Sequence, residues 1–317
     1  MALDQATQDY LATLEAQGRP PTHELTPDEA RSYGPELIKL IGPGPDVARV
    51  QDTTLEADDG TPFAVRVLAS EGTAKAVIVY YHGGGWVIGS IDQFDTLGRQ
   101  LADRTGCAVV LVDYRKAPEH PYPAAVDDAW HALQWVEENL EEIAGVRVPL
   151  IVAGDSAGGN LAAVLAHRAR DRSGPPIAYQ VLVYPVTNSD LDNRSYLDPA
   201  NQLLLNRETM VWFWNHYLPD VETRTEPDAS PLHAPDRAGL PSALIVLAEH
   251  DVLRNEGEAY ADGLRRAGVA VEQQTFSGQM HGFFSMVNIL PGSTRAIDYI
   301  VEHLTEFLDH PTPTKSS

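Results

Sequence analysis

Apolar segments of strand length alternate with longer helical segments from about residue 49 onward. Strands are predicted at 49–56, 62–69, 75–81, 107–112, 148–153, 178–183, 242–248 and 270–276. Several of them are almost entirely apolar, which is typical of strands that are covered on both faces. Helices are predicted between and after them, at 93–104, 123–140, 156–170, 255–268 and 293–309. This alternation predicts an α/β fold with a mostly parallel, eight-stranded sheet and helices on both faces, the first two strands forming an antiparallel edge.

Two segments of the chain fall outside this alternation. The first 40 residues contain two predicted helices, 4–17 and 26–40, and Thr26 with Glu29 suits a capping box at the start of the second. Residues 188–240 contain no clear strand but include an aromatic-rich helix at 206–218. An interruption of about 50 residues inside an α/β core predicts an inserted cap or lid.

The composition limits the partners and the compartment of the chain. A formal net charge of −22 disfavours binding to nucleic acid and to anionic membrane surfaces. No run of about 18 apolar residues is present, so no transmembrane helix is expected. The N-terminus lacks the basic and apolar regions of a signal peptide, which favours a cytoplasmic location. Cys107 is the only cysteine, so no intrachain disulfide is expected.

The segment Gly154–Gly159 (GDSAGG) matches the pattern G-x-S-x-G and lies between an apolar strand and an alanine-rich helix. A sharp strand-to-helix turn of this kind exposes the serine hydroxyl, and its flanking residues are small because the backbones approach closely. The start of the helix also favours negative charge that develops nearby. Ser156 is therefore predicted to be a covalent nucleophile.

The same segment is similar to the serine motif of chymotrypsin-like proteases, but two features exclude that class. Those proteases are all-β proteins with the chain order His, Asp, Ser, whereas this chain alternates strands with helices. The single cysteine, Cys107, also leaves the chain without their disulfides.

A glycine run at 82–86 (HGGGW) directly follows the apolar strand that ends at residue 81. Glycines at this place let backbone N–H groups point into a cavity, and in lipases and esterases this loop supplies part of the oxyanion hole. Gly83 and Gly84 are the predicted donors, with Ala157 as the third. The glycine patterns of nucleotide-binding loops are missing from the sequence, which disfavours nucleotide binding. His82 is interpreted as a residue that shapes the loop rather than as a base.

A serine nucleophile needs a general base, and that base needs a carboxylate to orient it. In hydrolases of this pattern the chain order is Ser, then Asp or Glu, then His. Of the eleven histidines, His281 follows the last predicted strand and satisfies this order, so it is the predicted base. Glu249 and Asp251 both follow the strand at 242–248, and spacing alone leaves the choice between them nearly even.

Segments 82–86, 113–120, 154–160, 248–256 and 280–283 together resemble the hormone-sensitive-lipase-like esterases (bacterial family IV) of the α/β-hydrolase superfamily. They occur in the order of that family and extend over most of the main domain. The resemblance implies carboxylesterase activity and a triad of Ser156, Asp251 and His281, with Glu249 as a structural carboxylate. It also implies the oxyanion donors Gly83, Gly84 and Ala157. Lys116 stands where the family commonly has Leu.

The resemblance also implies a cap built from both helical segments. The expected organisation is an N-terminal cap segment at 1–48, a catalytic domain at 49–187 and 226–310, an inserted cap segment at 188–225 and a polar tail at 311–317. No metal or organic cofactor is expected, since the triad needs none. Members of the family are often dimers, so a homodimer is a further expectation.

The expected substrates are small esters with short to medium acyl chains, because the inserted cap segment is rich in bulky side chains. Trp86, Leu204, Trp212 and Phe284 are the candidate substrate-binding residues. An amidase or peptidase would use the same triad and is the enzymatic alternative. A hydrolase-like receptor that binds a small molecule without cleaving it is the more distant one, because such receptors lose the catalytic histidine and this chain keeps His281.

Overall fold

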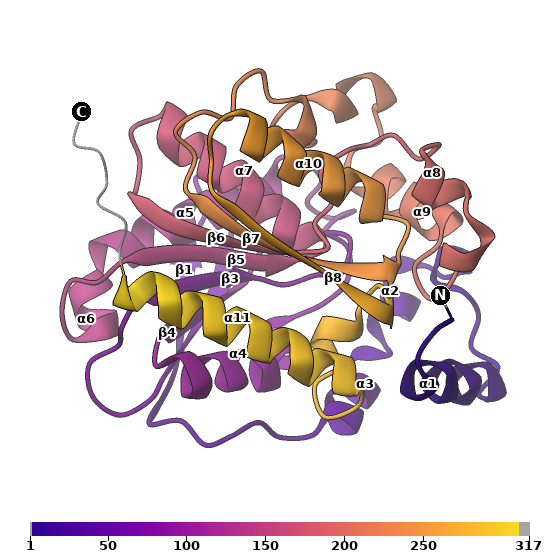
Figure 1. Ribbon diagram of the computed structural model, residues 1–317, viewed down its shortest axis with the longest axis horizontal. Helices are drawn as coiled ribbons and strands as arrows, with labels where there is room; N and C mark the ends of the chain where they lie inside the picture. Colours follow the sequence, from indigo (N-terminus) through magenta and orange to yellow (C-terminus); the bar gives the residue numbers. More distant parts are fainter. Residues whose placement is uncertain (1, 311–317) are drawn as a thin grey trace.

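A computed structural model of the chain describes residues 2–310, so the predicted polar tail at 311–317 lies outside the described residues (Figure 1). The sheet has the strand order β1-β2-β4-β3-β5-β6-β7-β8. β2 is antiparallel to β1 and β4, and all other neighbours are parallel. The eight strands are β1 (Arg49–Glu56), β2 (Pro62–Ala69), β3 (Val77–Tyr81), β4 (Ala108–Asp113), β5 (Leu150–Asp155), β6 (Ile177–Val183), β7 (Ser242–His250) and β8 (Val271–Met280). The predicted mostly parallel, eight-stranded sheet is confirmed.

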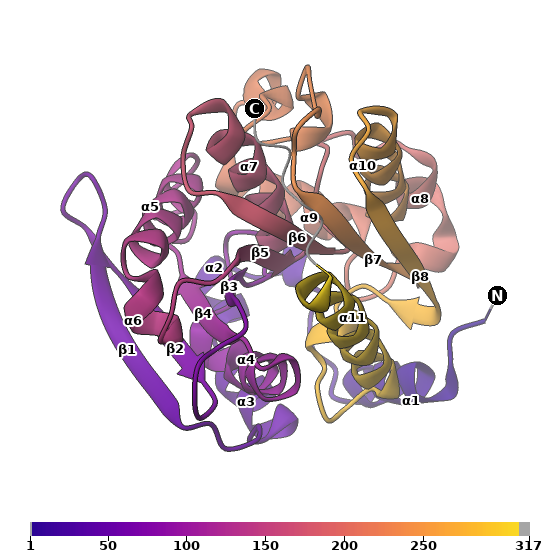
Figure 2. The ribbon, with the colours of Figure 1, turned by 60° about the vertical axis from the view of Figure 1, so that its left-hand side comes forward.

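Helices cover both faces of this sheet (Figures 1 and 2). One face packs against α4 (Ile91–Thr105) and α11 (Pro291–Asp309). The other packs against α5 (Ala124–Glu138), α6 (Leu140–Ala144), α7 (Ala157–Asp171) and α10 (Arg254–Arg266). The inner parallel strands β3 to β7 are largely buried on both sides, which explains why their sequences read as nearly continuous apolar runs, whereas the edge strand β8 alternates.

Most of the remaining helices belong to the two segments outside the alternation. The N-terminal segment contains α1 (Gln5–Ala16), the 3₁₀-helix η1 (Thr22–Glu24), α2 (Pro27–Arg31) and α3 (Gly34–Ile41). The segment after β6 contains α8 (Arg194–Leu197), η2 (Pro199–Asn201), α9 (Arg207–Tyr217), η3 (Val221–Thr225) and η4 (Pro231–His233). A further 3₁₀-helix, η5 (Phe283–Ser285), follows β8. Between residues 2 and 310 no helix combines the length and the apolar character that crossing a bilayer requires.

The predicted single helix at 26–40 is wrong, because the structure divides it into α2 and α3. The break at residues 32–33 precedes Gly34 and Pro35, and a proline has no N–H to continue the hydrogen-bond ladder of a preceding helix. The predicted capping box is present: the Thr26 hydroxyl accepts from the Glu29 amide, and the Glu29 carboxylate accepts from the Thr26 amide.

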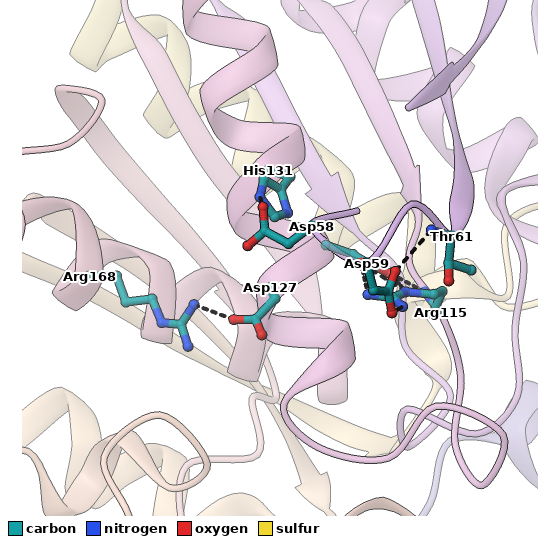
Figure 3. A network of polar contacts seen from close by, with 8 residues as sticks. Asp58, Asp59, Thr61, Arg115, Asp127, His131 and Arg168 are labelled. Carbon is teal, nitrogen blue, oxygen red and sulfur yellow. Dashed lines mark hydrogen bonds and ion pairs between the residues drawn. The ribbon is translucent and has the colours of Figure 1, made fainter. Parts of the chain in front are cut away.

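Arg115 ties the edge hairpin of the sheet to helix α5 (Figure 3). Its guanidinium donates to Asp59 in the turn between β1 and β2 at 2.7 Å, and to the fully buried Asp128 of α5 at 2.8 Å. The Arg115 amide also donates to Asp128, at 2.8 Å. A second contact in Figure 3, Asp58 with His131 at 3.0 Å, joins the same turn to the same helix. The segment that follows β4 is thus tied to the hairpin and to α5, and it also contacts the glycine loop after β3, where the Ala117 amide donates to the Trp86 carbonyl at 2.9 Å.

Candidate active site

Ser156 lies at the sharp turn between β5 and α7, with φ 56° and ψ −119°. A residue with a side chain is strained in this conformation, and such strain persists where the surroundings enforce it. The neighbouring glycines show how tightly this turn is packed. A Cβ atom at Gly154 would overlap the Gly158 carbonyl, and a Cβ atom at Gly158 would overlap the carbonyl of Tyr81. The G-x-S-x-G pattern is therefore a steric requirement of the turn.

A chain of hydrogen bonds connects Ser156 to His281 and Asp251. Ser156 Oγ lies 3.0 Å from His281 Nε2, and His281 Nδ1 lies 2.8 Å from Asp251 Oδ2. The other carboxylate oxygen of Asp251 accepts from the Leu253 amide at 2.9 Å. Asp251 is fully buried, whereas Ser156 and His281 keep a small exposed fraction. The fold thus brings together three residues that lie up to 125 positions apart in the sequence.

Glu249 makes different contacts from Asp251. Its Oε2 accepts from the Ser277 hydroxyl and from the Gly278 amide, both at 2.8 Å. The bond from the Gly278 amide is the main reason why the pKa of Glu249 falls to about 2. The carboxylate holds the end of β8, which agrees with its interpretation as a structural group.

Tyr184 is a contact of the site that sequence reasoning missed. It follows β6, is fully buried, and its ring centroid lies 4.4 Å from that of His281. Its φ of 34° is unusual for a residue with a side chain, and its amide donates to the Val246 carbonyl in the middle of β7. The only signal in the sequence is an aromatic residue at a strand end, directly before Pro185.

The glycine loop corrects one predicted oxyanion donor. The Gly83 amide donates to Asp155 Oδ1 at 2.9 Å, so it is not free to bind a substrate oxygen. The amides of Gly84 and Gly85 have no acceptor within residues 2–310, and both residues have positive φ (119° and 57°). Ala157 is the first residue of α7, where an amide has no partner inside its own helix. The free amides are therefore those of Gly84, Gly85 and Ala157.

Asp155 and His82 hold this loop in place through contacts with Gly83. Asp155 is buried and also accepts from the Tyr80 hydroxyl at 2.8 Å, and its burial raises its pKa. His82 Nδ1 lies 2.7 Å from the Gly83 carbonyl, and the His82 ring stacks on that of Tyr114 with centroids 4.4 Å apart. The predicted loop-shaping position of His82 fits these contacts.

Of the four candidate substrate-binding residues, two belong to the core. Phe284 is fully buried on the α4 and α11 face of the sheet, among Ile78, Leu101 and Ile300. Trp86 is also fully buried, and its ring stacks on Tyr217 of α9 with centroids 4.0 Å apart. Both predictions are therefore wrong, because each side chain is buried against other residues of the protein and leaves no surface for a substrate.

The other two candidates lie in the inserted segment. Trp212 is half-buried, and its indole N–H donates to the Leu25 carbonyl at 3.1 Å, which joins α9 to the N-terminal segment. Leu204 is 38% exposed. For both residues, contact with an acyl chain stays a prediction.

The chain matches known proteins over most of its length. A family model described as "alpha/beta hydrolase fold" matches residues 78–285. Carboxylesterase NlhH of Mycobacterium tuberculosis is 42% identical over 83% of this chain and 82% of its own length. Ethyl acetate hydrolase of Pseudomonas putida is 35% identical over 97% of this chain and 100% of its own.

Solved structures agree with this relationship. The hyperthermophilic esterase from the archaeon Pyrobaculum calidifontis superposes with a TM-score of 0.90 at 37% identity, over 97% of this chain and 99% of that chain. The fold, the order of the motifs and these relatives point the same way. The chain therefore belongs to the α/β-hydrolase fold family, in its hormone-sensitive-lipase-like branch, and is a carboxylesterase that hydrolyses carboxylic esters.

Proposed function

We propose that Ser156, His281 and Asp251 form the catalytic triad of this carboxylesterase and that the reaction proceeds through an acyl-enzyme on Ser156. The observation that carries the proposal is the pair of hydrogen bonds from Ser156 Oγ to His281 Nε2 and from His281 Nδ1 to Asp251 Oδ2. Acyl transfer requires a base that contacts the nucleophile on one side and an orienting carboxylate on the other, and His281 makes both contacts.

In the first half-reaction, Ser156 Oγ attacks the ester carbonyl while His281 Nε2 takes its proton. The buried Asp251 accepts from Nδ1–H and stabilises the imidazolium that forms. The imidazolium then protonates the leaving alcohol as the carbon–oxygen bond of the ester breaks. In the second half-reaction, water attacks the acyl-enzyme, His281 takes its proton, and the acid leaves as Ser156 regains its hydrogen.

The negative charge on the tetrahedral oxygen needs donors beside the nucleophile. We assign this role to the amides of Gly84, Gly85 and Ala157, in place of the set predicted from sequence. Each such donor contributes about 2.7–4 kcal/mol to the stabilisation of the transition state in characterised hydrolases. Support comes from the free amides of the two glycines and from the engagement of Gly83 by Asp155.

We further propose that residues 1–48 and 188–225 act together as a cap that favours esters with short to medium acyl chains. Trp212 joins the two segments through Leu25. The ring of Phe213 lies where a side chain at Gly85 would stand, so bulky cap residues close over the glycine loop. The relationship to a protein named ethyl acetate hydrolase agrees with small substrates.

A series of 4-nitrophenyl esters with increasing acyl length tests the substrate proposal, with matched 4-nitroanilides as amide substrates and Ser156→Ala as the control. We expect kcat/KM to peak at short or medium chains, anilide cleavage to be far slower, and the control to be inactive. A peak at long chains would contradict the acyl preference. Faster cleavage of anilides would identify an amidase, and binding without turnover would identify a receptor.

A further inference from the structure

The last strand of the sheet carries a bulge directly before His281. Ala248 of β7 pairs with Phe276 of β8, and the next pair is His250 with Met280. One residue of β7 therefore faces three residues of β8, numbers 277–279, which we call the β8 bulge. Bulges next to active sites redirect the chain and thereby the side chains that follow. The position of His281 depends on how this bulge is held.

The N-terminal segment and β7 hold the β8 bulge from opposite sides. On the β7 side, the Gly278 amide donates to Glu249 at 2.8 Å. On the other side, the Asp4 amide donates to the Gly278 carbonyl at 3.0 Å, and Gln279 Nε2 donates to Asp4 Oδ2 at 2.6 Å. Both views show the start of the chain beside the end of β8 (Figures 1 and 2).

The fit between these segments leaves little room for adjustment. Gly278 has φ +71°, and a Cβ atom on it would stand 2.9 Å from the Asp4 nitrogen. Gln279 is fully buried, and a Cβ atom at Gly292 would overlap its side-chain oxygen. The Gln279 side chain therefore has little room to move, and its NH₂ group donates to the Asp4 carboxylate.

The two carboxylate oxygens of Asp4 have separate tasks. Oδ1 accepts from the Thr7 amide at 2.9 Å and caps α1. Oδ2 accepts from Gln279 and lies 3.5 Å from Arg295 of α11. Burial would raise the pKa of Asp4, but Thr7, Gln279 and Arg295 outweigh it and lower that pKa, so the group is ionised at neutral pH.

We propose that Asp4 is a positioning residue for His281: through Gln279 and the β8 bulge it sets the distance of the imidazole from Ser156 and couples helix α1 to the catalytic base. This inference rests on the proposed role of His281. Asp4 does not touch the reacting atoms. It affects the fraction of molecules in which the His281 imidazole lies within hydrogen-bond distance of the Ser156 hydroxyl.

Asp4→Asn isolates this role. Asparagine is as good an N-cap as aspartate, so the bond to the Thr7 amide is kept. Its NH₂ group can take the place of Oδ2, where it would face the NH₂ group of Gln279 and remove the acceptor. We expect kcat for 4-nitrophenyl acetate to fall about tenfold with KM within about twofold, since a small misplacement of a catalytic group costs rate rather than binding. The rate of Ser156 phosphonylation by a 4-nitrophenyl phosphonate should fall by the same factor.

Two variants complete the design. Asp236→Asn changes another aspartate whose side chain accepts from a backbone amide, that of Ala238 at 2.8 Å; it is exposed and lies outside the cap, so it should behave as wild type. The double variant Asp4→Asn/Gln279→Glu restores a donor–acceptor pair with the roles exchanged, and it should recover most of the lost kcat. All rates are measured well below the Tm of each variant.

The outcomes separate this inference from the proposed function. If His281→Ala stays active, the proposed triad is wrong. If His281→Ala is inactive but Asp4→Asn matches Asp236→Asn, only the positioning role is overturned. It is also overturned if Asp4→Asn lowers kcat and the double variant recovers none of it, because then the loss does not pass through the contact with Gln279.

Discussion

Arg31 connects helix α2 to the glycine loop and therefore offers a sharp test of how the N-terminal segment docks. Its Nε donates to the Val87 carbonyl at 2.9 Å, and its Nη2 donates to the Ala117 carbonyl at 2.8 Å. The same guanidinium makes a bidentate ion pair with Glu119, in which Nη1 donates to Oε1 and Nη2 donates to Oε2, both at 2.7 Å. Val87 directly follows the glycine run, so one side chain joins the N-terminal helices to the loop with the free amides.

The magnitudes of these contacts differ. A hydrogen bond from a charged donor contributes about 1.5–3 kcal/mol, and both carbonyl bonds are only partly buried, so the lower end gives about 3 kcal/mol for the two. The Glu119 carboxylate is half-exposed, and an ion pair of this kind adds about 1 kcal/mol or less. Arg31→Met should therefore lower the free energy of unfolding by about 3–4 kcal/mol, and Glu119→Gln by about 1 kcal/mol or less.

Urea unfolding at pH 7 measures both variants against the wild type, with kcat for a short ester recorded in parallel. Arg31→Met should also lower kcat, because the loop that carries the free amides loses its anchor at Val87. If Glu119→Gln cost as much as Arg31→Met, the ion pair and not the carbonyl bonds would dock the segment. The reasoning would also fail if Arg31→Met unfolded like the wild type.

Two further predictions concern carboxylates near the site. Asp251→Asn should lower kcat about 10³–10⁴-fold with KM nearly unchanged, because an amide can hold the wrong tautomer of His281; steady-state kinetics on a short ester checks this, and a loss below tenfold would contradict it. Burial would raise the pKa of Asp113, but His82 and Lys116, the latter at 2.7 Å, lower it from 3.8 to about 2. This lowering of the Asp113 pKa contributes roughly 2 kcal/mol at most to the free energy of unfolding at pH 7. The contribution is lost as the pH falls from about 4 through about 2. Asp113→Asn should therefore be less stable than the wild type at pH 7 in urea unfolding, with a difference that shrinks below pH 4; a difference that grows there would contradict the assignment.

The parts of the site that could be predicted from sequence depend on local structure or chain order. Ser156 stands at a turn whose tight packing requires the adjacent glycines, so the motif, with the apolar strand before it and the helix after it, was enough to locate it. His281 was located by its place after the last strand. The choice between Glu249 and Asp251 required the family resemblance, since both lie at the same strand end and only the packing of β8 separates their contacts.

The errors came from contacts between distant segments. Which glycine amide is free depends on Asp155, a carboxylate 72 positions beyond Gly83 that reaches the loop from a neighbouring strand. Phe284 was a candidate substrate-binding residue, but η5 turns it into the core. The break before Gly34 was different: its signal, a Gly-Pro pair, was present in the sequence and local.

The most direct test of the account is to find the atom that carries the acyl group. The protein is treated with a 4-nitrophenyl phosphonate, which is attacked like an ester but is not released, and the modified peptide is identified by mass spectrometry. We predict one adduct per chain, on Ser156, with a matched loss of esterase activity and no adduct in Ser156→Ala. An adduct on any other residue that accompanies inactivation, or full activity with Ser156 modified, would contradict the central claim.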